Sequence, residues 1–273
     1  PSSLPFISAS GNGTFNLDTH SLHGKAAGRL NAAVTSLGAL LPRLTAIGPA
    51  TLESTFDLTY QAEEIRFESL TLAATANTPL VSARAQQPFT FAPGPNTLTL
   101  TEPTAPWLEG TVHRLPIICL NGLVPGLTFS GGDAHGDYLV NTINEKFTLR
   151  SPTPFIATGV NLHRDGQPIA EKLDLTMAII AESTPRGWQV QGAPLTVRSA
   201  GRPLATIAAT VTPLAGSGGR MDISGEGRVE LAALATQPAF TLLRHLDVDS
   251  ATGKFSAKVG AAQEVTGQVT VRG

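Results

Sequence analysis

Two groups of polar residues have types and spacings that could support metal or acid–base chemistry. His20 and His23 have the H-x-x-H spacing of some metal sites, and Asp133, His135 and Asp137 alternate as residues on one face of a strand do. A zinc site would need a further acidic or histidine ligand after His23 in a helical frame, and none follows. Carboxylates and histidines are ordinary on outward strand positions, so we expect a polar loop and a solvated strand face.

The remaining polar motifs also favour structure over chemistry. The segment QAEEIRFE places three glutamates around Arg66, and the alternation of Ile65 and Phe67 with them predicts a solvated strand face. The glycine-rich SGNGTF and GSGGR lack the helix start and lysine of a phosphate-binding loop, so we interpret both as turns. Cys119, the one cysteine, lies in an apolar run and is expected to be buried. With no nucleophile elbow or triad, we expect no enzyme, catalytic residue, metal or cofactor.

Composition further narrows the classes of protein to which this chain could belong. The 273 residues are 41% hydrophobic but only 15% charged, with a net charge of −2 and with scattered lysines and arginines. A nucleic-acid-binding protein would show a basic patch, so we exclude that partner. The longest apolar runs are far shorter than the roughly 20 residues that span a bilayer. The chain begins at Pro1 and reads as a segment of something longer, so we expect any membrane anchor to lie outside it.

The elements that position these residues are mostly strands. Apolar residues of one parity alternate with polar ones along several segments, which is typical of half-buried strands. The clearest sets are Phe56, Leu58 and Tyr60; Leu173, Leu175, Met177 and Ile179; Phe255, Ala257 and Val259; and Val265, Val269 and Val271. Each strand therefore has one apolar and one polar face.

The residues between the strands predict tight hairpins. Asp165-Gly166 and Ala200-Gly201 offer the positive φ angles that two-residue turns require, and Ala76-Asn77 offers an asparagine for the same purpose. Each pair is followed by a proline at the start of the return strand, where no ladder donor is needed: Pro79, Pro168 and Pro203. Short turns join antiparallel neighbours, which argues against a parallel sheet.

Segment 29–44 has Leu30, Val34, Leu37, Leu41 and Leu44 at spacings of three and four residues, and segment 229–246 repeats the idea with Leu231, Leu234, Leu242 and Leu246. Both predict short amphipathic helices. Each contains a proline, Pro42 or Pro238, that limits or interrupts the helix. An apolar segment, a turn and a set of antiparallel strands recur about every hundred residues. We therefore predict three degenerate units at 1–105, 106–212 and 213–273, the last incomplete, with sheet edges that neighbouring units cover.

The apolar faces of the strands can be covered in two ways. Either the sheet folds on itself and this face is the core of a closed structural or adhesive β-protein, or part of the face stays open for a partner. An acyl chain would suit an open face, because each buried CH₂ contributes about 0.8 kcal/mol.

Several segments resemble the AsmA-like proteins of bacterial envelopes, including the TamB and YdbH relatives, which belong to the repeating β-groove, bridge-like lipid-transfer proteins. The resemblance rests on LNGLVPGLTFSGGDAHGDYLV, LRHLDVDSATGKFSAKV and LPRLTAIGPATLESTF, with the hairpins RDGQPIA and SAGRPLA, and its outline covers most of the chain. It implies an elongated, curved antiparallel sheet, the β-taco, whose apolar groove carries phospholipid between the inner and outer membranes. It also implies a periplasmic, inner-membrane-anchored protein, and an envelope or outer-membrane partner protein is a further expectation.

The predicted function is therefore binding and transport of phospholipid or another acyl lipid, with the structural or adhesive protein as the alternative. The residues expected to line the groove are Phe56, Leu58, Tyr60, Leu173, Leu175, Met177, Ile179, Phe255 and Val259.

Overall fold

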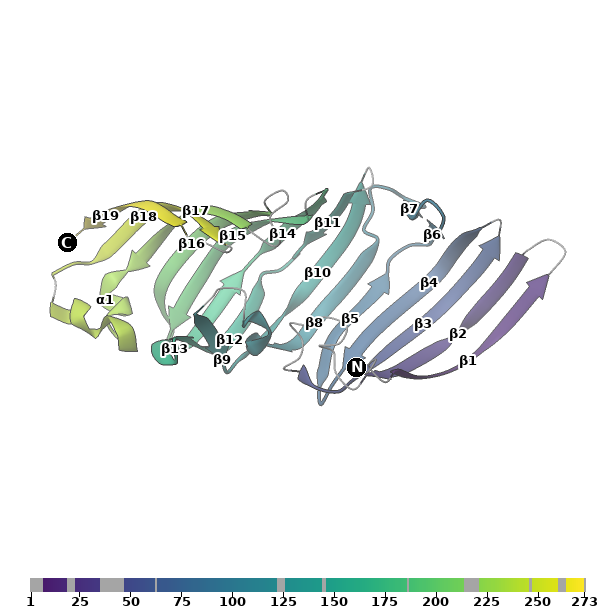
Figure 1. Ribbon diagram of the computed structural model, residues 1–273, viewed down its shortest axis with the longest axis horizontal. Helices are drawn as coiled ribbons and strands as arrows, with labels where there is room; N and C mark the ends of the chain where they lie inside the picture. The colour runs from purple at the N-terminus through teal and green to yellow at the C-terminus, as the bar shows by residue number, and fades with distance from the viewer. Residues whose placement is uncertain are drawn as a thin grey trace. The chain divides into compact units, whose positions relative to one another are not determined.

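In a computed structural model the chain is mainly β, and 19 strands belong to one antiparallel sheet (Figure 1). The structure describes residues 7–18, 23–34, 47–61, 63–121, 126–143, 146–185, 187–213, 221–245, 247–259 and 264–272. Two compact units divide the chain: unit 1 is Pro1–Leu115 with Asp137–Thr148, and unit 2 is Pro116–Gly136 with Leu149–Gly273. The predicted curved antiparallel sheet is confirmed, whereas the three repeated units remain a prediction.

Unit 1 is built from long strands in sequential antiparallel pairs. Its strands are β1 (Ile7–Asp18), β2 (His23–Val34), β3 (Ala50–Gln61), β4 (Glu64–Thr75), β5 (Pro79–Ala85), β6 (Phe89–Ala92), β7 (Thr97–Leu100), nearly all of β8 (Leu108–Pro116), and parts of β10 (Asp133–Ile143) and β11 (Lys146–Arg150). Strands β1 to β5 pair in chain order, β8 pairs with β5, and the β6–β7 hairpin pairs with one end of β4.

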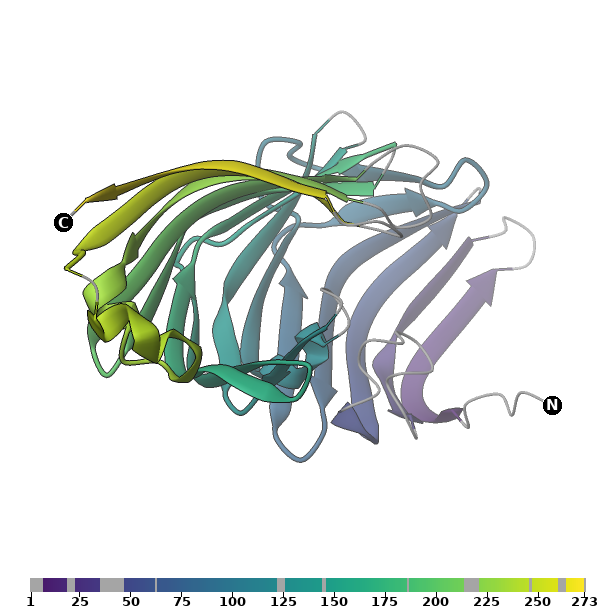
Figure 2. The ribbon, with the colours of Figure 1, turned by 60° about the vertical axis from the view of Figure 1, so that its left-hand side comes forward.

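Unit 2 continues with antiparallel strands and adds short helical turns. Its further elements are the 3₁₀ turn η3 (Ile117–Leu120), β9 (Leu127–Ser130), β12 (Phe155–Arg164), β13 (Gln167–Met177), β14 (Ile179–Thr184), β15 (Gly187–Ser199), β16 (Arg202–Pro213), β17 (Met221–Glu230), α1 (Leu231–Leu234), the 3₁₀ turn η4 (Pro238–His245), β18 (Ser250–Val259) and β19 (Glu264–Arg272). The strands β15 to β19 are bowed along their length, and α1 and η4 follow the end of β17 (Figure 2).

Two of the three predicted tight turns are confirmed. Asp165 and Gly166 have φ angles of 51° and 79°, and Ala200 and Gly201 have 49° and 76°, so all four residues are left-handed as a two-residue type I′ turn requires. Among the described residues with a positive φ angle, Asn77 is absent, so its backbone is not left-handed. The reason is the longer bend over residues 76–78, which joins β4 to β5 without a two-residue turn.

All three hairpins carry a bulge directly after the proline of the return strand. Pro168 pairs with His163 and Ala170 with Leu162; Pro203 pairs with Arg198 and Ala205 with Val197; Pro79 pairs with Thr75 and Val81 with Ala74. The extra residues are therefore Ile169, Leu204 and Leu80. Leu80 and Leu204 are each only 3% exposed, and Ile169 packs against the same buried cluster as Leu204. The bulge re-aims one apolar side chain into the interior at each hairpin.

Two sequence predictions are corrected here. Residues 29–34 of the predicted helix 29–44 belong to β2, while 35–44 fall outside the described residues. Pairing with β1 on one side and β3 on the other provides backbone hydrogen bonds that override the leucine spacing. The stretch SGNGTF, expected to be a turn, lies within β1, and GSGGR lies outside the described residues.

The second predicted helix is confirmed over α1 and η4, although Val229 and Glu230 belong to β17.

The buried core is small among the residues that the structure describes. In unit 2, Ile117, Ala157, Val160, Ala170, Leu173 and Leu204 form the main cluster, and Ala233 of α1 packs against it. In unit 1, Ala50 and Leu80 form a second cluster. Most large apolar side chains of the described strands are instead only half-buried. The sheet therefore leaves much of its apolar face partly exposed.

Candidate binding face

Register places the apolar residues of unit 1 on one face of the sheet. Directly opposite one another across β2, β3, β4, β5 and β8 lie Ala32, Leu52, Ala74, Val81 and Val112. The next residues on the same face form the row Leu30, Ser54, Leu72, Ala83 and Gly110. Nine of these ten residues are apolar or glycine, so the face is apolar across all five strands.

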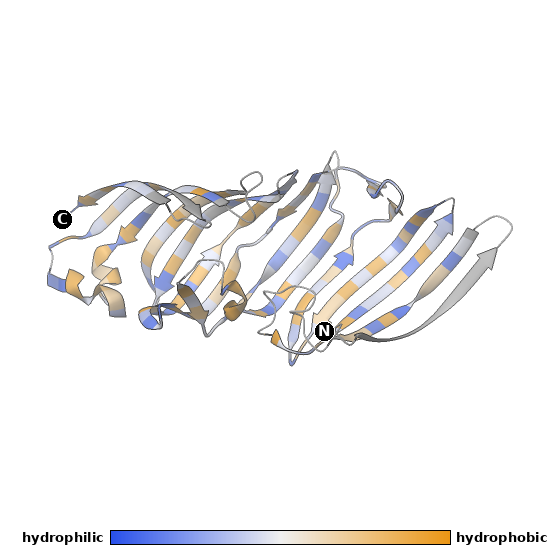
Figure 3. Ribbon diagram, in the orientation of Figure 1, coloured by the Kyte–Doolittle hydropathy of each residue, from blue (hydrophilic) through white to orange (hydrophobic). Residues whose placement is uncertain are grey.

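The opposite face of the same strands is polar. Its rows are Asn31, Glu53, Ala73, Ser82 and Thr111, and Arg29, Thr55, Thr71, Arg84 and Glu109. Cross-strand ion pairs join Arg29 to Glu53 at 2.9 Å and Arg84 to Glu109 at 3.6 Å. Figure 3 shows the resulting bands of alternating hydropathy along the strands. A shift by one residue would exchange the two faces, so this alternation fixes the register.

A hollow of about 400 Å³ opens on the apolar face of unit 1. Its floor contains small side chains from successive strands, namely Ala32, Ser54, Ala74 and Ala83, and Leu30, Leu52, Leu72 and Val81 stand around them. Leu30 and Leu72 flank Ser54 in register and are each 43% exposed. Small residues next to large ones therefore create the hollow, and it runs across the strands.

Among the described residues, Tyr138 of β10 is the one lining residue that comes from beyond β5. Its ring lies over Gly110 of β8, so closely that a Cβ atom at Gly110 would collide with the ring carbon Cζ and the hydroxyl oxygen. The hydroxyl donates a 3.3 Å hydrogen bond to the carbonyl oxygen of Ser82 on β5. Burial raises the pKa of the Tyr138 phenol, because the charged phenolate would lose solvation there.

Aromatic residues of the apolar face recur opposite glycines on neighbouring strands. Phe56 pairs with Gly28, and Tyr60 pairs with Gly24. In unit 2, Phe255 lies between Gly225 and Gly267, with its Cζ atom 2.9 Å from where a Cβ at Gly225 would be. Because glycine has no side chain, a large ring can lie down along the sheet and cover the neighbouring backbone.

Unit 2 repeats the separation of faces over more strands. One row contains only apolar residues: Ala157, Leu175, Val197, Ala205, Val229, Ala251 and Val271. The adjacent row on the other face contains Thr176, Thr196, Thr206, Arg228, Thr252 and Thr270. On β19, Val269 and Val271 are 71% and 54% exposed. The apolar face of unit 2 is therefore in contact with solvent at β19.

Register places eight of the nine predicted groove residues on these apolar faces, and the side chain of the ninth, Val259, lies outside what the structure describes. Phe56, Leu58 and Tyr60 alternate along β3 and are half-buried. Leu173, Leu175 and Met177 alternate along β13; Leu173 belongs to the buried cluster, and Leu175 packs against it. Ile179 begins β14, because the strand is broken at Ala178, and its side chain is half-buried. Phe255 is half-buried on β18, and Val259 occupies the register position opposite Met221.

The residues around the unit 1 hollow were not among the predicted ones. Leu30 and Ala32 fall within the segment 29–44 that was expected to be helical, and Tyr138 follows the glycine-rich SGGDAHGD. Leu70 and Leu72 alternate with polar residues in ESLTLAAT, so strand periodicity could have identified them. No sequence signal indicates that Tyr138 reaches Gly110, because that contact depends on the pairing of β10 with β8.

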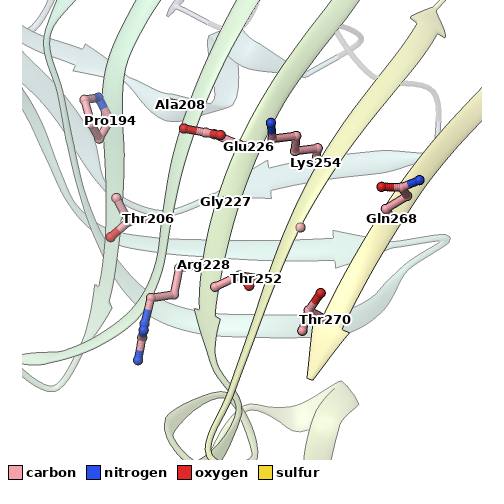
Figure 4. A pocket seen from close by; sticks show the side chains of 11 residues that line it. Pro194, Thr206, Ala208, Glu226, Gly227, Arg228, Thr252, Lys254, Gln268 and Thr270 are labelled. Atoms are coloured by element: carbon pink, nitrogen blue, oxygen red, sulfur yellow. The ribbon is translucent and has the colours of Figure 1, made fainter. Parts of the chain in front are cut away.

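A larger hollow, about 720 Å³, lies on the polar face of unit 2 (Figure 4). Thr206, Thr252 and Thr270 line it together with the charged residues Glu226, Arg228 and Lys254. Glu226 and Lys254 are direct cross-strand partners, and Arg228 Nε lies 2.5 Å from Glu230 Oε1. This ion pair lowers the pKa of the Glu230 carboxyl, through the hydrogen bond from Arg228. Arg228 of the lining is therefore paired with an acidic residue beside the hollow, and Lys254 lies in register with the acidic Glu226.

The polar motifs show no convergent site in the described chain. Asp133 and His135 alternate on β10 with Ala134, which packs against the buried cluster, and Asp137 accepts a 2.8 Å hydrogen bond from Thr111. Glu64, Arg66 and Glu68 are exposed on β4 as predicted. His20 lies outside the described residues, as does the side chain of His23. Among the residues that the structure describes, no three His, Cys, Asp or Glu residues are grouped as metal ligands.

Cys119 is buried in η3, as expected from its apolar surroundings. Burial raises the pKa of its thiol, which lowers the fraction of reactive thiolate.

Comparison of the chain with protein-family models, with curated proteins and with solved structures finds no match. In the part of the chain that the structure describes, no helix is long and apolar enough to cross a membrane.

Proposed function

We propose that this chain is an acyl-lipid-binding segment of a bacterial envelope lipid-transport protein of the AsmA-like kind. The observation that carries the proposal is the apolar face of unit 1, which is continuous in register over five strands and contains an apolar hollow of about 400 Å³. Ligand pockets in proteins typically measure about 300–1,000 Å³. The hollow thus has a suitable size for one hydrocarbon chain.

The dimensions of the hollow favour an acyl chain as the occupant. Adjacent strands are about 4.8 Å apart, so the four strands β2 to β5 extend over about 15 Å. One leaflet of a bilayer has a hydrocarbon depth of about 15 Å, half of a core of about 30 Å. A chain of about twelve carbons along this path would gain on the order of 10 kcal/mol gross from burial at about 0.8 kcal/mol per CH₂.

The partial exposure of this face favours lipid binding over the structural or adhesive alternative. A closed β-protein would bury its apolar face, yet Leu30 and Leu72 beside the hollow are each 43% exposed. Val269 and Val271 of unit 2 are more exposed still. Exposed apolar surface of this kind marks a binding surface. Periplasmic location, an anchor outside this segment, an envelope partner and transport between membranes belong to the same proposal and rest on the resemblance to AsmA-like proteins.

The proposal is tested with a matched pair of variants on β4. The protein is purified from a bacterial host without detergent, and native mass spectrometry counts co-purifying phospholipid. A diazirine-bearing fatty acid then measures cross-linking to tryptic peptide 67–84. Leu72→Asp places a charge on the apolar face, whereas Thr71→Asp places the same charge on the polar face one residue away.

We expect Leu72→Asp to lose at least tenfold in cross-linking and Thr71→Asp to retain it. Because Leu72 is half-exposed, the substitution leaves the fold intact, and circular dichroism checks this point. A wild-type protein that carries no lipid and cross-links no fatty acid would support the structural alternative.

A further inference from the structure

We infer that Tyr138 is the end wall of the acyl-chain hollow in unit 1 and sets the chain length that the hollow accepts. This inference rests on the proposed function. It names a specificity-determining residue for lipid and makes no claim about chemistry on the lipid.

The lining of the hollow shows where it ends. The wall and floor come from β2, β3, β4 and β5, and the next strand in the sheet, β8, contributes no side chain to the lining. At that place β8 has Gly110, in register with Ala83 of the floor. The hollow would continue over this glycine if the ring of Tyr138 did not lie on it.

Two contacts hold Tyr138 in this position. The first is the close packing of the ring on Gly110, where no side chain of β8 competes for the space. The second is the hydrogen bond from the hydroxyl to the Ser82 carbonyl oxygen on β5, which ties the ring across β8. At 3.3 Å this bond is longer than the usual 2.7–2.8 Å, so packing is the main restraint.

Removing the ring should lengthen the hollow by one strand. The path from β2 to β5 measures about 15 Å, and adding β8 extends it by about 5 Å. The added floor would be Gly110, with Val112 of the same face beside it. A hollow longer by about one third should accept a longer chain, and each additional seated methylene should raise affinity about fourfold.

The experiment measures chain-length preference at this hollow alone. A diazirine-bearing fatty acid is cross-linked to tryptic peptide 67–84, which contains Leu72, Ala74, Val81 and Ala83. Unlabelled saturated fatty acids of 10 to 20 carbons compete with this probe. In the wild-type protein, competition should improve with length and then reach a plateau where the chain meets Tyr138.

Three variants separate the ring from its hydroxyl and from general effects. Tyr138→Ala removes the wall and should move the plateau to chains at least two carbons longer, with a gain of about tenfold or more for those chains. Tyr138→Phe keeps the ring and should retain the wild-type plateau. Glu109→Gln, beside Gly110 on the polar face, is the matched control and should also retain it.

The outcomes distinguish the two proposals. If the wild-type protein binds fatty acids but Tyr138→Ala keeps the same plateau, Tyr138 is not the end wall, and lipid binding stands. If Tyr138→Phe shifts the plateau as far as Tyr138→Ala, the ring is not the wall. If no fatty acid competes in any variant, the proposed function itself fails.

Discussion

Glycine at position 110 is required by space and not by backbone conformation. Its φ angle is not left-handed, but a Cβ there would collide with Tyr138 and would lie 2.5 Å from the Ser82 carbonyl oxygen. Phe255 and Gly225 repeat this arrangement in unit 2. At the residue scale, then, the apolar faces are shaped by where side chains are absent as much as by where leucines stand.

The first prediction concerns this contact. Gly110→Ala should lower the free energy of unfolding by about 1–3 kcal/mol, the usual cost of overpacking, because the backbone carbonyl of Ser82 has little room to move. Gly94→Ala is the matched control, since its Cβ would meet nothing within 4 Å, and its effect should stay within about 0.5 kcal/mol. Urea unfolding measures both. Equal midpoints for the two variants would contradict the close approach of Tyr138 and Ser82 to Gly110.

At the element scale, the repeated feature of the hairpins is the bulge that follows the proline. The sequence RDGQPIA predicts the left-handed pair and the proline at the start of the return strand, and the structure confirms both. It does not predict that the residue after the proline is unpaired and buried, because a bulge depends on register with the partner strand. The helix expected at 29–44 fails for the same reason: leucine spacing is local, and the pairing of residues 29–34 with β1 and β3 is not.

Burial of the bulge residue gives a second prediction. Leu204→Ala should cost about 2–5 kcal/mol, because Leu204 is 3% exposed and packs in the main cluster of unit 2. Leu242→Ala in η4 removes the same atoms from a side chain that is 79% exposed, and it should change stability by less than about 0.5 kcal/mol. Thermal and urea unfolding compare the pair. A small effect at Leu204 would show that the bulge does not anchor the hairpin to the core.

At the scale of the whole molecule, the buried clusters are small and the apolar faces are half-exposed. The alternation of the sequence was sufficient to predict strands with one apolar face, and it placed Phe56, Leu58 and Tyr60 on that face. It could not predict the hollow, since the hollow depends on which small residues of different strands become neighbours. A chain with so much apolar surface in contact with water should gain stability when a ligand covers it.

The last prediction follows from this linkage. Saturating fatty acid should raise the stability of the delipidated protein by about 2.7 kcal/mol at a hundred times Kd, which corresponds to a Tm increase of about 5–10 °C for a chain of this size. Leu72→Asp should reduce the increase by blocking unit 1, and adding Val269→Asp should reduce it further if the exposed face of unit 2 also binds. Thr71→Asp and Thr270→Asp, their neighbours on the polar faces, should keep the full increase. Differential scanning fluorimetry measures each shift. An identical Tm with and without fatty acid would mean that the apolar faces are stable without a lipid.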